Sequence, residues 1–277
     1  MYLTCKKQHI DLSIPKVMGI LNVTPDSFFD GGKYHSDKEI IKQTKKMLKH
    51  GATFIDIGAY SSRPNAKHIS EKEELERIVP IVKLLVQKFP RILISIDTFR
   101  SEVAKQCLDA GACMINDISG GNQDKNMFSV VATYQVPYIL MHMKGSPQNM
   151  QNNPEYKDVI QEITSFFIEK TNQLKALNVK NVILDVGFGF GKTIEHNYTI
   201  LRELKRITTL GYPVLAGISR KSMLYKVLNS TPKKMKNATS IANTIALLNG
   251  AKIVRVHDVK EAVECVKIVG ELNGFKP

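Results

Sequence analysis

Polar side chains stand at or near the ends of several apolar runs along this chain. They are Asn22, Asp97, Asn116, Asp185, Arg255 and His257. Because strand side chains alternate between faces, Asn116 shares a face with Met114, and Asp185 shares one with Ile183. Burying carboxylates, amides and a guanidinium with nothing to bind would cost several kcal/mol for each unpaired group. Their recurrence at five strand ends therefore predicts a functional site on the rim that these ends share.

Two loops add groups that suit an anionic ligand. The loop at 61–64 has the sequence Ser-Ser-Arg-Pro and follows a short apolar run. The loop at 219–221, Ser-Arg-Lys, precedes a helical segment. The first-turn amides of a helix favour anions, so these loops predict an anion-binding contribution to the same rim.

A glycine-rich loop at 187–193 places Phe188 and Phe190 between glycines. Aromatic rings held in this way indicate a flat, apolar slot for an aromatic ligand. The end of the loop, Gly-Lys-Thr, matches the end of a phosphate-binding loop. The first glycine of that motif would fall at Val186, so the sequence excludes the motif.

One histidine near the rim has a different interpretation. His142 ends an apolar run, while Met141 and Met143 lie on the opposite alternation. We interpret His142 as a structural histidine and Met141 as an apolar wall of the pocket. His142 and His257 lie on different strands without a carboxylate at ligand spacing, which argues against a zinc site.

Eight short apolar runs, each bounded by Gly, Pro or polar residues, alternate with helical patterns. The runs cover 17–23, 53–58, 92–97, 113–118, 136–143, 181–186, 213–218 and 252–257. This pattern is typical of buried parallel strands, and eight β–α units favour a closed barrel. The predicted class is α/β. We expect one domain over 1–277, a single (β/α)8 TIM barrel at 17–277 preceded by a short N-terminal hairpin at 1–16.

Two of the predicted helices carry clear local signals. Ser70 and Glu73 have the spacing of a capping box ahead of a helix over 75–89. Pro80 lies inside this segment and should kink or shorten it. A second helix is predicted over 155–177, where apolar residues follow one stripe.

The bulk composition agrees with a single barrel. The chain has 277 residues and 43% hydrophobic content, and a (β/α)8 barrel typically needs about 250 residues. No apolar run reaches the roughly 18 residues of a membrane span, and the first residues lack a signal-peptide pattern. The four cysteines are scattered and predict reduced thiols. We therefore expect a cytoplasmic protein without a membrane partner.

The formal net charge of +13 comes mainly from lysines spread over the helical segments. No arginine-rich arm accompanies them, so a non-catalytic, nucleic-acid-binding barrel is the weaker interpretation and we expect no nucleic-acid partner. Base composition of the genome is a second explanation. A third is a field that attracts anionic substrates.

Several motifs together resemble the dihydropteroate synthase family in order and spacing. They are MGILNVTPDSFFDGG, the Ser-Ser-Arg-Pro loop, SIDTFRSEVA, MINDISGG, DVGFGFGKT, GISRKSM and KIVRVHDV. The resemblance spans essentially the whole chain. It implies a folate-pathway transferase with Mg²⁺ as cofactor, usually a homodimer. This enzyme condenses 6-hydroxymethyl-7,8-dihydropterin diphosphate with p-aminobenzoate and releases diphosphate.

The resemblance also assigns residues to each part of the site. The pterin residues would be Asp97, Asn116, Asp185 and Lys221, beside Met141. The diphosphate residues would be Asn22, Arg63, Arg255 and His257, with Asn22 also the metal ligand. The p-aminobenzoate residues would be Phe28, Ser62, Arg63, Pro64, Phe190, Ser219 and Lys221. The catalytic residues would be Asp97, Lys221, Arg255 and His257.

The implied mechanism is dissociative, because an arylamine is a poor nucleophile. Mg²⁺, Arg255 and His257 would stabilise the charge that grows on diphosphate, and Asp97 would stabilise the cationic pterin methylene before the amine attacks. The alternative within the same barrel type is a pterin- or methyltetrahydrofolate-binding methyltransferase domain. That alternative does not need Lys221, Arg255 or His257, and we expect these residues to discriminate against it.

Overall fold

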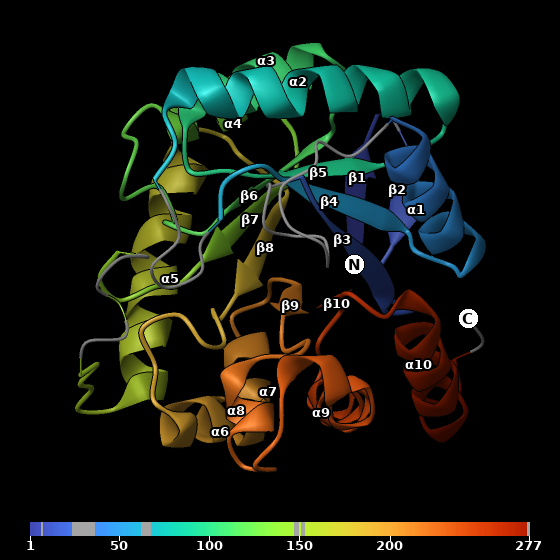
Figure 1. The fold of residues 1–277 in the computed structure, drawn as a ribbon. Coiled ribbons are helices and arrows are strands. Elements are labelled where there is room, and N and C mark those ends of the chain that lie inside the picture. The colour runs from blue at the N-terminus through green and yellow to red at the C-terminus, as the bar shows by residue number, and fades with distance from the viewer. Residues whose placement is uncertain (7, 24–36, 62–67, 147–149, 151–152, 276–277) are drawn as a thin grey trace.

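The computed structural model describes residues 1–6, 8–23, 37–61, 68–146, 150 and 153–275. Eight parallel strands close into a barrel in the order β10-β3-β4-β5-β6-β7-β8-β9, with the helices outside it (Figure 1). The strands are β3 (Lys16–Asn22), β4 (Phe54–Gly58), β5 (Ile94–Asp97), β6 (Met114–Asp117), β7 (Tyr138–Met141), β8 (Val182–Asp185), β9 (Val214–Ala216) and β10 (Ile253–Val256). They coincide with the eight predicted runs, so the (β/α)8 prediction is confirmed.

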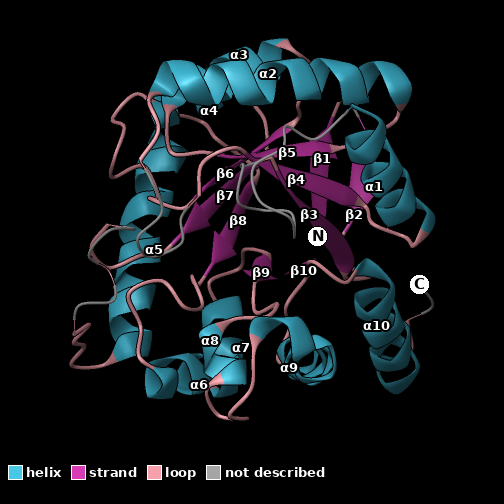
Figure 2. Cartoon of the chain, in the orientation of Figure 1, coloured by secondary structure: helices cyan, strands magenta, loops and turns pink. Residues whose placement is uncertain are grey.

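Helices separate successive strands and surround the barrel (Figure 2). They are α1 (Asp37–Lys49), α2 (Glu71–Lys88), α3 (Ser101–Asp109), α4 (Met127–Tyr134), α5 (Val159–Ala176), α6 (Ile194–Arg202), α7 (Leu204–Thr208), α8 (Ser222–Tyr225), α9 (Lys236–Leu248) and α10 (Val259–Asn273), with a 3-10 turn, η1 (Pro232–Lys234). Among the described residues, none of these helices is both long and apolar enough to cross a membrane.

Helix α2 shows one correct local prediction and one wrong one. The Ser70 side chain caps the helix by accepting a hydrogen bond from the Glu73 amide at 3.1 Å. Of the two effects expected of Pro80, a kink or a shortened helix, the shortening is wrong, because α2 continues to Lys88, and the kink stays a prediction. Pro80 lies on the exposed face, where water can bind the carbonyl that the missing N–H leaves free, while Ile78 and Val82 bury the opposite stripe.

Helix α5 begins four residues later than predicted. The Asp158 side chain accepts hydrogen bonds from the amides of Ile160 at 2.9 Å and Gln161 at 3.0 Å. An N-cap aspartate satisfies amides that have no partner within the helix, so it fixes the start at Val159. The segment 155–157 therefore precedes the helix.

The N-terminal hairpin closes one end of the barrel. Strands β1 (Tyr2–Cys5) and β2 (Gln8–Asp11) pair antiparallel, as predicted. The hairpin side chains Leu3 and Cys5, together with Leu12, join one buried cluster with the lower layer of the barrel interior. That layer consists of Met18, Phe54, Leu93, Cys113, Met114, Ile139, Ile183, Leu215 and Ile253. The amino-terminal end is thus apolar and covered, which leaves the carboxyl ends of the strands for polar chemistry.

Candidate active site

Polar residues predicted from the strand ends meet at the carboxyl ends of the strands, above this apolar interior. Asp97 pairs in register with Asn116 on the neighbouring strand, and Asp185 pairs with Met141. Arg255 crosses the barrel from β10, and its Nη2 lies 2.6 Å from Oδ2 of Asp97. The structure therefore brings Asp97, Asn116, Asp185 and Arg255 to the same rim.

A residue that the sequence reasoning missed lies at the centre of this network. Asp56 is fully buried in β4, and its Oδ2 lies 2.6 Å from Nε of Arg255. The same oxygen accepts a hydrogen bond from Nδ2 of Asn116 at 3.0 Å. The available signal was a lone carboxylate between Ile55 and Ile57 in an otherwise apolar strand. It does not end the strand, so the strand-end pattern could not reveal it.

The second half of the rim contains a carboxylate, Asp185, and a lysine, Lys221, that attract each other electrostatically. Oδ1 of Asp185 accepts a hydrogen bond from the Gly187 amide at 2.8 Å. Lys221 stands just before α8, and its Nζ donates to the Phe188 carbonyl. The same Nζ lies 4.6 Å from the centre of the Phe190 ring, within the range of a cation–π contact. Lys221 is thus attracted to Asp185 and contacts Phe188 and Phe190 of the glycine-rich loop.

Burial shifts the ionisation of these groups. It raises the pKa of Asp97 to about 7, although Arg255 opposes the shift and Asp56 adds to it. Burial also raises the pKa of Asp185, and it lowers the pKa of Lys221 to about 8 against the attraction of Asp185. For Arg255, burial lowers the pKa, but the carboxylates of Asp56 and Asp97 outweigh it and raise the value. Such perturbed groups gathered at one rim are typical of functional sites.

An apolar wall lies beside the charged groups. Met141 is 2% exposed and packs in a cluster with Phe99, Ile118, Met143 and Met150, and Phe190 packs against this cluster. Met141 therefore belongs to an apolar cluster, and its predicted role as a wall of the ligand pocket stays a prediction. The two aromatic rings of the glycine-rich loop separate, because Phe188 is fully buried in the main core. The prediction that both rings line a slot is wrong for Phe188 and agrees with the position of Phe190.

Three further predicted residues lie at this end of the barrel. The Ser219 hydroxyl lies 3.0 Å from Nδ1 of His257 and accepts a hydrogen bond from the His257 amide at 3.2 Å. Asn22 ends β3 opposite Gly58, which in turn pairs with Asp97. The remaining predicted residues, Phe28, Ser62, Arg63 and Pro64, lie outside the described residues.

A buried lysine fixes the glycine-rich loop to the end of β7. Lys192 is 3% exposed, and its Nζ contacts Nδ1 of His142 at 3.1 Å and the His142 carbonyl at 3.2 Å. It also donates to the Phe190 carbonyl at 2.9 Å. The interpretation of His142 as a structural histidine agrees with these contacts and with its burial, which lowers its pKa to about 2.

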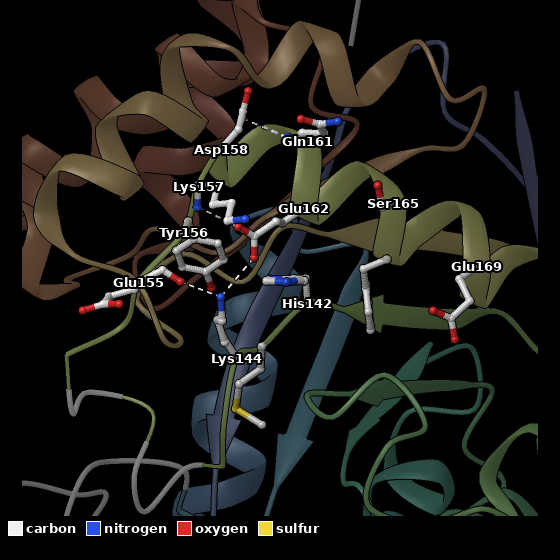
Figure 3. Close-up of a pocket in the computed structure, with 12 residues that line it drawn as sticks. His142, Lys144, Glu155, Tyr156, Lys157, Asp158, Gln161, Glu162, Ser165 and Glu169 are labelled. Atoms are coloured by element: carbon white, nitrogen blue, oxygen red, sulfur yellow. Dashed lines mark hydrogen bonds and ion pairs between the residues drawn. The ribbon is translucent and has the colours of Figure 1, made fainter.

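A separate groove of about 820 Å³ lies between the end of β7 and α5 (Figure 3). One lysine of the groove is engaged within it: Lys144 pairs with Glu162 at 3.0 Å and donates to the backbone carbonyl of Glu155 at 2.5 Å. Asp158 is engaged as the N-cap of α5. The groove thus lacks the convergent carboxylates, amide and guanidinium of the barrel rim, and we assign the chemistry to the rim.

The barrel and its polar rim define the class of protein. The chain matches the family model described as "Pterin binding enzyme" over residues 18–257. This match covers all eight strand ends and every rim residue described above, from Asn22 to His257.

Similar proteins narrow the class further. The chain is 47% identical over 259 residues to the dihydropteroate synthase of Synechocystis sp., covering 92% of this chain and 89% of that protein. It is 42% identical to that of Haemophilus influenzae, covering 97% and 98%. A Yersinia pestis dihydropteroate synthase, solved as a sulfonamide drug complex, superimposes with a TM-score of 0.94 at 42% identity, covering 99% and 100%. The chain belongs to the dihydropteroate synthase family, and its activity is that of this transferase of folate biosynthesis.

Proposed function

We propose that the rim performs the synthase reaction by releasing diphosphate before p-aminobenzoate attacks. The observation that carries this proposal is the convergence of Asp97, Asn116, Asp185 and Arg255 above the apolar layer of the barrel. Relatives with known ligands support the choice of substrates. A Xanthomonas albilineans synthase is solved with 4-aminobenzoic acid (TM-score 0.91, 35% identity, 98% of each chain covered). Another structure from that organism is a complex with 7,8-dihydropteroate.

The deep part of the rim binds the pterin in this proposal. A pterin edge carries amino, amide and ring-nitrogen groups, which need both acceptors and donors. Asp97 and Asp185 supply acceptors, and Lys221 supplies a donor. Oδ1 of Asn116 is buried without a hydrogen-bond partner among the described residues, so it is ready to accept from a ligand. A site that binds each of these groups rejects rings that lack them, because its buried polar atoms would remain unpaired.

Arg255 and His257 bind the diphosphate and stabilise its departure. Arg255 carries a planar guanidinium whose fork suits phosphate oxygens, and the buried carboxylates around it keep it charged. Charge stabilisation of this kind contributes roughly 3–4 kcal/mol for a well-placed donor. Departure leaves a cationic methylene on the pterin, and the Asp97 carboxylate provides the fixed negative charge beside it.

Asn22 fits a magnesium site at the diphosphate. Its amide oxygen ends β3 on the same rim as Asp97, and Mg²⁺ prefers oxygen ligands from few side chains together with phosphates and water. Asn22 would therefore hold Mg²⁺, which would neutralise part of the phosphate charge when bound.

The apolar wall orients the arylamine. Phe190 offers a flat surface, and Lys221 beside the Phe190 ring offers a positive charge to the carboxylate of p-aminobenzoate, while Met141 in the same apolar cluster lies toward the pterin. Ser219 adds a hydroxyl near His257. We further propose that Phe28, Ser62, Arg63 and Pro64 complete this subsite.

The direct test mixes the purified protein with the pterin diphosphate, p-aminobenzoate and Mg²⁺ and measures dihydropteroate and diphosphate. We expect the two products in equal amounts, and we expect chelation of Mg²⁺ to suppress both. Absence of product with and without the metal would contradict the proposed function.

We also propose that the enzyme is a homodimer that uses the faces of α9 and α10. Large apolar side chains are exposed there, with Ile268 61% and Leu272 68% exposed; the others are Ile241, Ile245 and Leu248. Contiguous exposed apolar surface of this kind is typical of protein interfaces.

The four cysteines are buried and free, which supports a reducing, cytoplasmic location.

Sedimentation velocity tests the dimer. Ile245→Lys should shift the protein to a monomer, because it places a charge within the apolar face. Ile168→Lys is the matched control, since Ile168 is an exposed apolar residue on α5, away from α9 and α10. A wild-type monomer, or equal behaviour of the two variants, would refute this interface.

A further inference from the structure

Asp56 lies below the residues to which we assign contact with substrate. It pairs in register with Ile20 and Ser95, whereas Asp97 pairs with Gly58, two residues further along β4. Asp56 is therefore one interior layer deeper than Asp97. Its side chain is completely buried, and the apolar layer of Phe54 lies beneath it. An isolated carboxylate at this depth would be strongly unfavourable, so its partners explain its presence.

The partners of Asp56 are two side chains of the proposed site. One oxygen, Oδ2, accepts from both Nε of Arg255 at 2.6 Å and Nδ2 of Asn116 at 3.0 Å. Each bond orients the opposite end of its partner. Binding Nε leaves the Nη groups of Arg255 directed toward the rim, and binding Nδ2 leaves Oδ1 of Asn116 as an acceptor with no partner in the part of the chain that the structure describes.

Asp56 also shares the positive charge of Arg255 with Asp97. The guanidinium contacts Asp56 through Nε and Asp97 through Nη2, both at 2.6 Å. Without Asp56, Asp97 would be the one carboxylate of the described residues in direct contact with Arg255. The Asp97 carboxylate would then be neutralised by the Arg255 guanidinium, which must also bind the anionic ligand.

We propose that Asp56 is a positioning residue of the synthase reaction, which fixes Arg255 and Asn116 from below and keeps the Asp97 carboxylate available at the rim. This inference rests on the proposed roles of Arg255, Asn116 and Asp97. It predicts that Asp56 acts on catalysis through these side chains, without contact to either substrate.

Asp97 reports the effect of Asp56 through its ionisation. The ionisable groups that act on Asp97 are Arg255 and Lys221, which favour its charged form, and Asp56, Glu74 and Asp117, which oppose it. Removing the Asp56 charge removes one opposing group and frees Arg255 for Asp97. Both changes lower the pKa of Asp97. If the ionised carboxylate is the active form, the acidic limb of the kcat profile must then move to lower pH.

The experiment compares Asp56→Asn with Ser95→Ala in the complete enzyme. Asn keeps the shape and an acceptor oxygen but removes the charge. Ser95 is buried next to Asp56 in register, and its hydroxyl has no hydrogen-bond partner among the described residues, so Ser95→Ala is a matched control in the same layer. Misplacing reacting groups by about 1 Å lowers rates on the order of 10²-fold, which is the loss of kcat expected for Asp56→Asn. We also expect its acidic limb to shift down and Ser95→Ala to retain wild-type kinetics.

If Asp56→Asn folds and has the wild-type kcat, and if the acidic limb of its kcat–pH profile is not shifted, the proposal is overturned. A kcat loss without the shift would assign Asp56 a structural role only and would overturn it equally. If Asp56→Asn does not fold, the double variant Asp56→Asn/Arg255→Met removes both partners of the buried pair. Relative to Arg255→Met alone, its kcat/KM should fall by no more than the effect of Asn116→Ala, and a larger loss would contradict action through these two partners. An inactive wild-type enzyme would instead contradict the proposed function.

Discussion

Lys192 allows a quantitative test of the ionisation inside this barrel. Its ammonium group is buried among three acceptors from His142 and Phe190. Burial lowers its pKa from 10.5 to about 7, against the attraction of Asp185. Below pH 7 the lysine is protonated in both the folded and unfolded states. Between pH 7 and 10.5 the unfolded chain binds a proton that the folded protein has released.

The sign of the pH dependence follows from this difference. Stability rises with pH wherever the unfolded state binds more protons, by about 1.4 kcal/mol per pH unit for one full proton. The penalty from burying Lys192 is therefore complete below pH 7 and decreases as the pH rises toward 10.5. Between pH 7.5 and 9.0 the free energy of unfolding should gain about 2 kcal/mol from this residue.

The perturbation that isolates this term is Lys192→Met. Removing the buried charge stabilises the protein, whereas leaving three acceptors without a donor destabilises it. The difference in the free energy of unfolding between wild type and Lys192→Met at a single pH therefore cannot separate the two effects. Urea denaturation at pH 7.5 and 9.0 separates the two effects. Wild type should gain about 2 kcal/mol relative to Lys192→Met, and the exposed Lys205→Met control, which retains Lys192, should show the same gain as wild type. A difference between wild type and Lys192→Met that does not change with pH would refute the reasoning.

Three further substitutions test other parts of the molecule. Asp97→Asn should lower kcat on the order of 10²–10³-fold with little change in pterin affinity, measured by steady-state kinetics and calorimetry, because its charge acts in the transition state. Phe190→Leu should raise the KM for p-aminobenzoate roughly two- to tenfold and leave the KM for the pterin unchanged, because an aromatic contact contributes about 0.5–1.5 kcal/mol. Glu74→Ala should lower the free energy of unfolding by roughly 3–5 kcal/mol in urea titrations, because it leaves Arg100, now bound at 2.5 Å, as an unpaired charge.

The strand-end residues could be predicted because their positions follow from local rules. Each strand is a short apolar run, and alternation decides which side chain faces the interior at its last residues. Closure of eight such strands brings Asp97, Asn116, Asp185 and Arg255 together, although they are far apart in the sequence. The start of α5 was predicted less well, since it depends on whether the Asp158 side chain turns back to cap the helix.

Asp56 and Lys192 could not be predicted from the same rules. The contact from Arg255 to Asp56 joins residues 199 positions apart, and the contact from Lys192 to His142 joins residues 50 positions apart. Neither partner lies within the local pattern around the residue. Their roles arise only when the closed barrel brings β4 and β10 to the same side, and the end of β7 behind the glycine-rich loop.

The charges on the rim explain why a buried anchor is useful to this reaction. Asp97 and the proposed diphosphate compete for the same guanidinium, so an empty site holds Arg255 against Asp97 and a loaded site must share it. Since Nε of Arg255 remains bound to Asp56, this exchange can occur at the Nη edge alone, without withdrawal of the whole side chain. The negative charge of Asp97 is then less neutralised by Arg255 when the departing diphosphate leaves a cation beside it. Asp56 thereby couples anion binding to the electrostatic stabilisation of that cation.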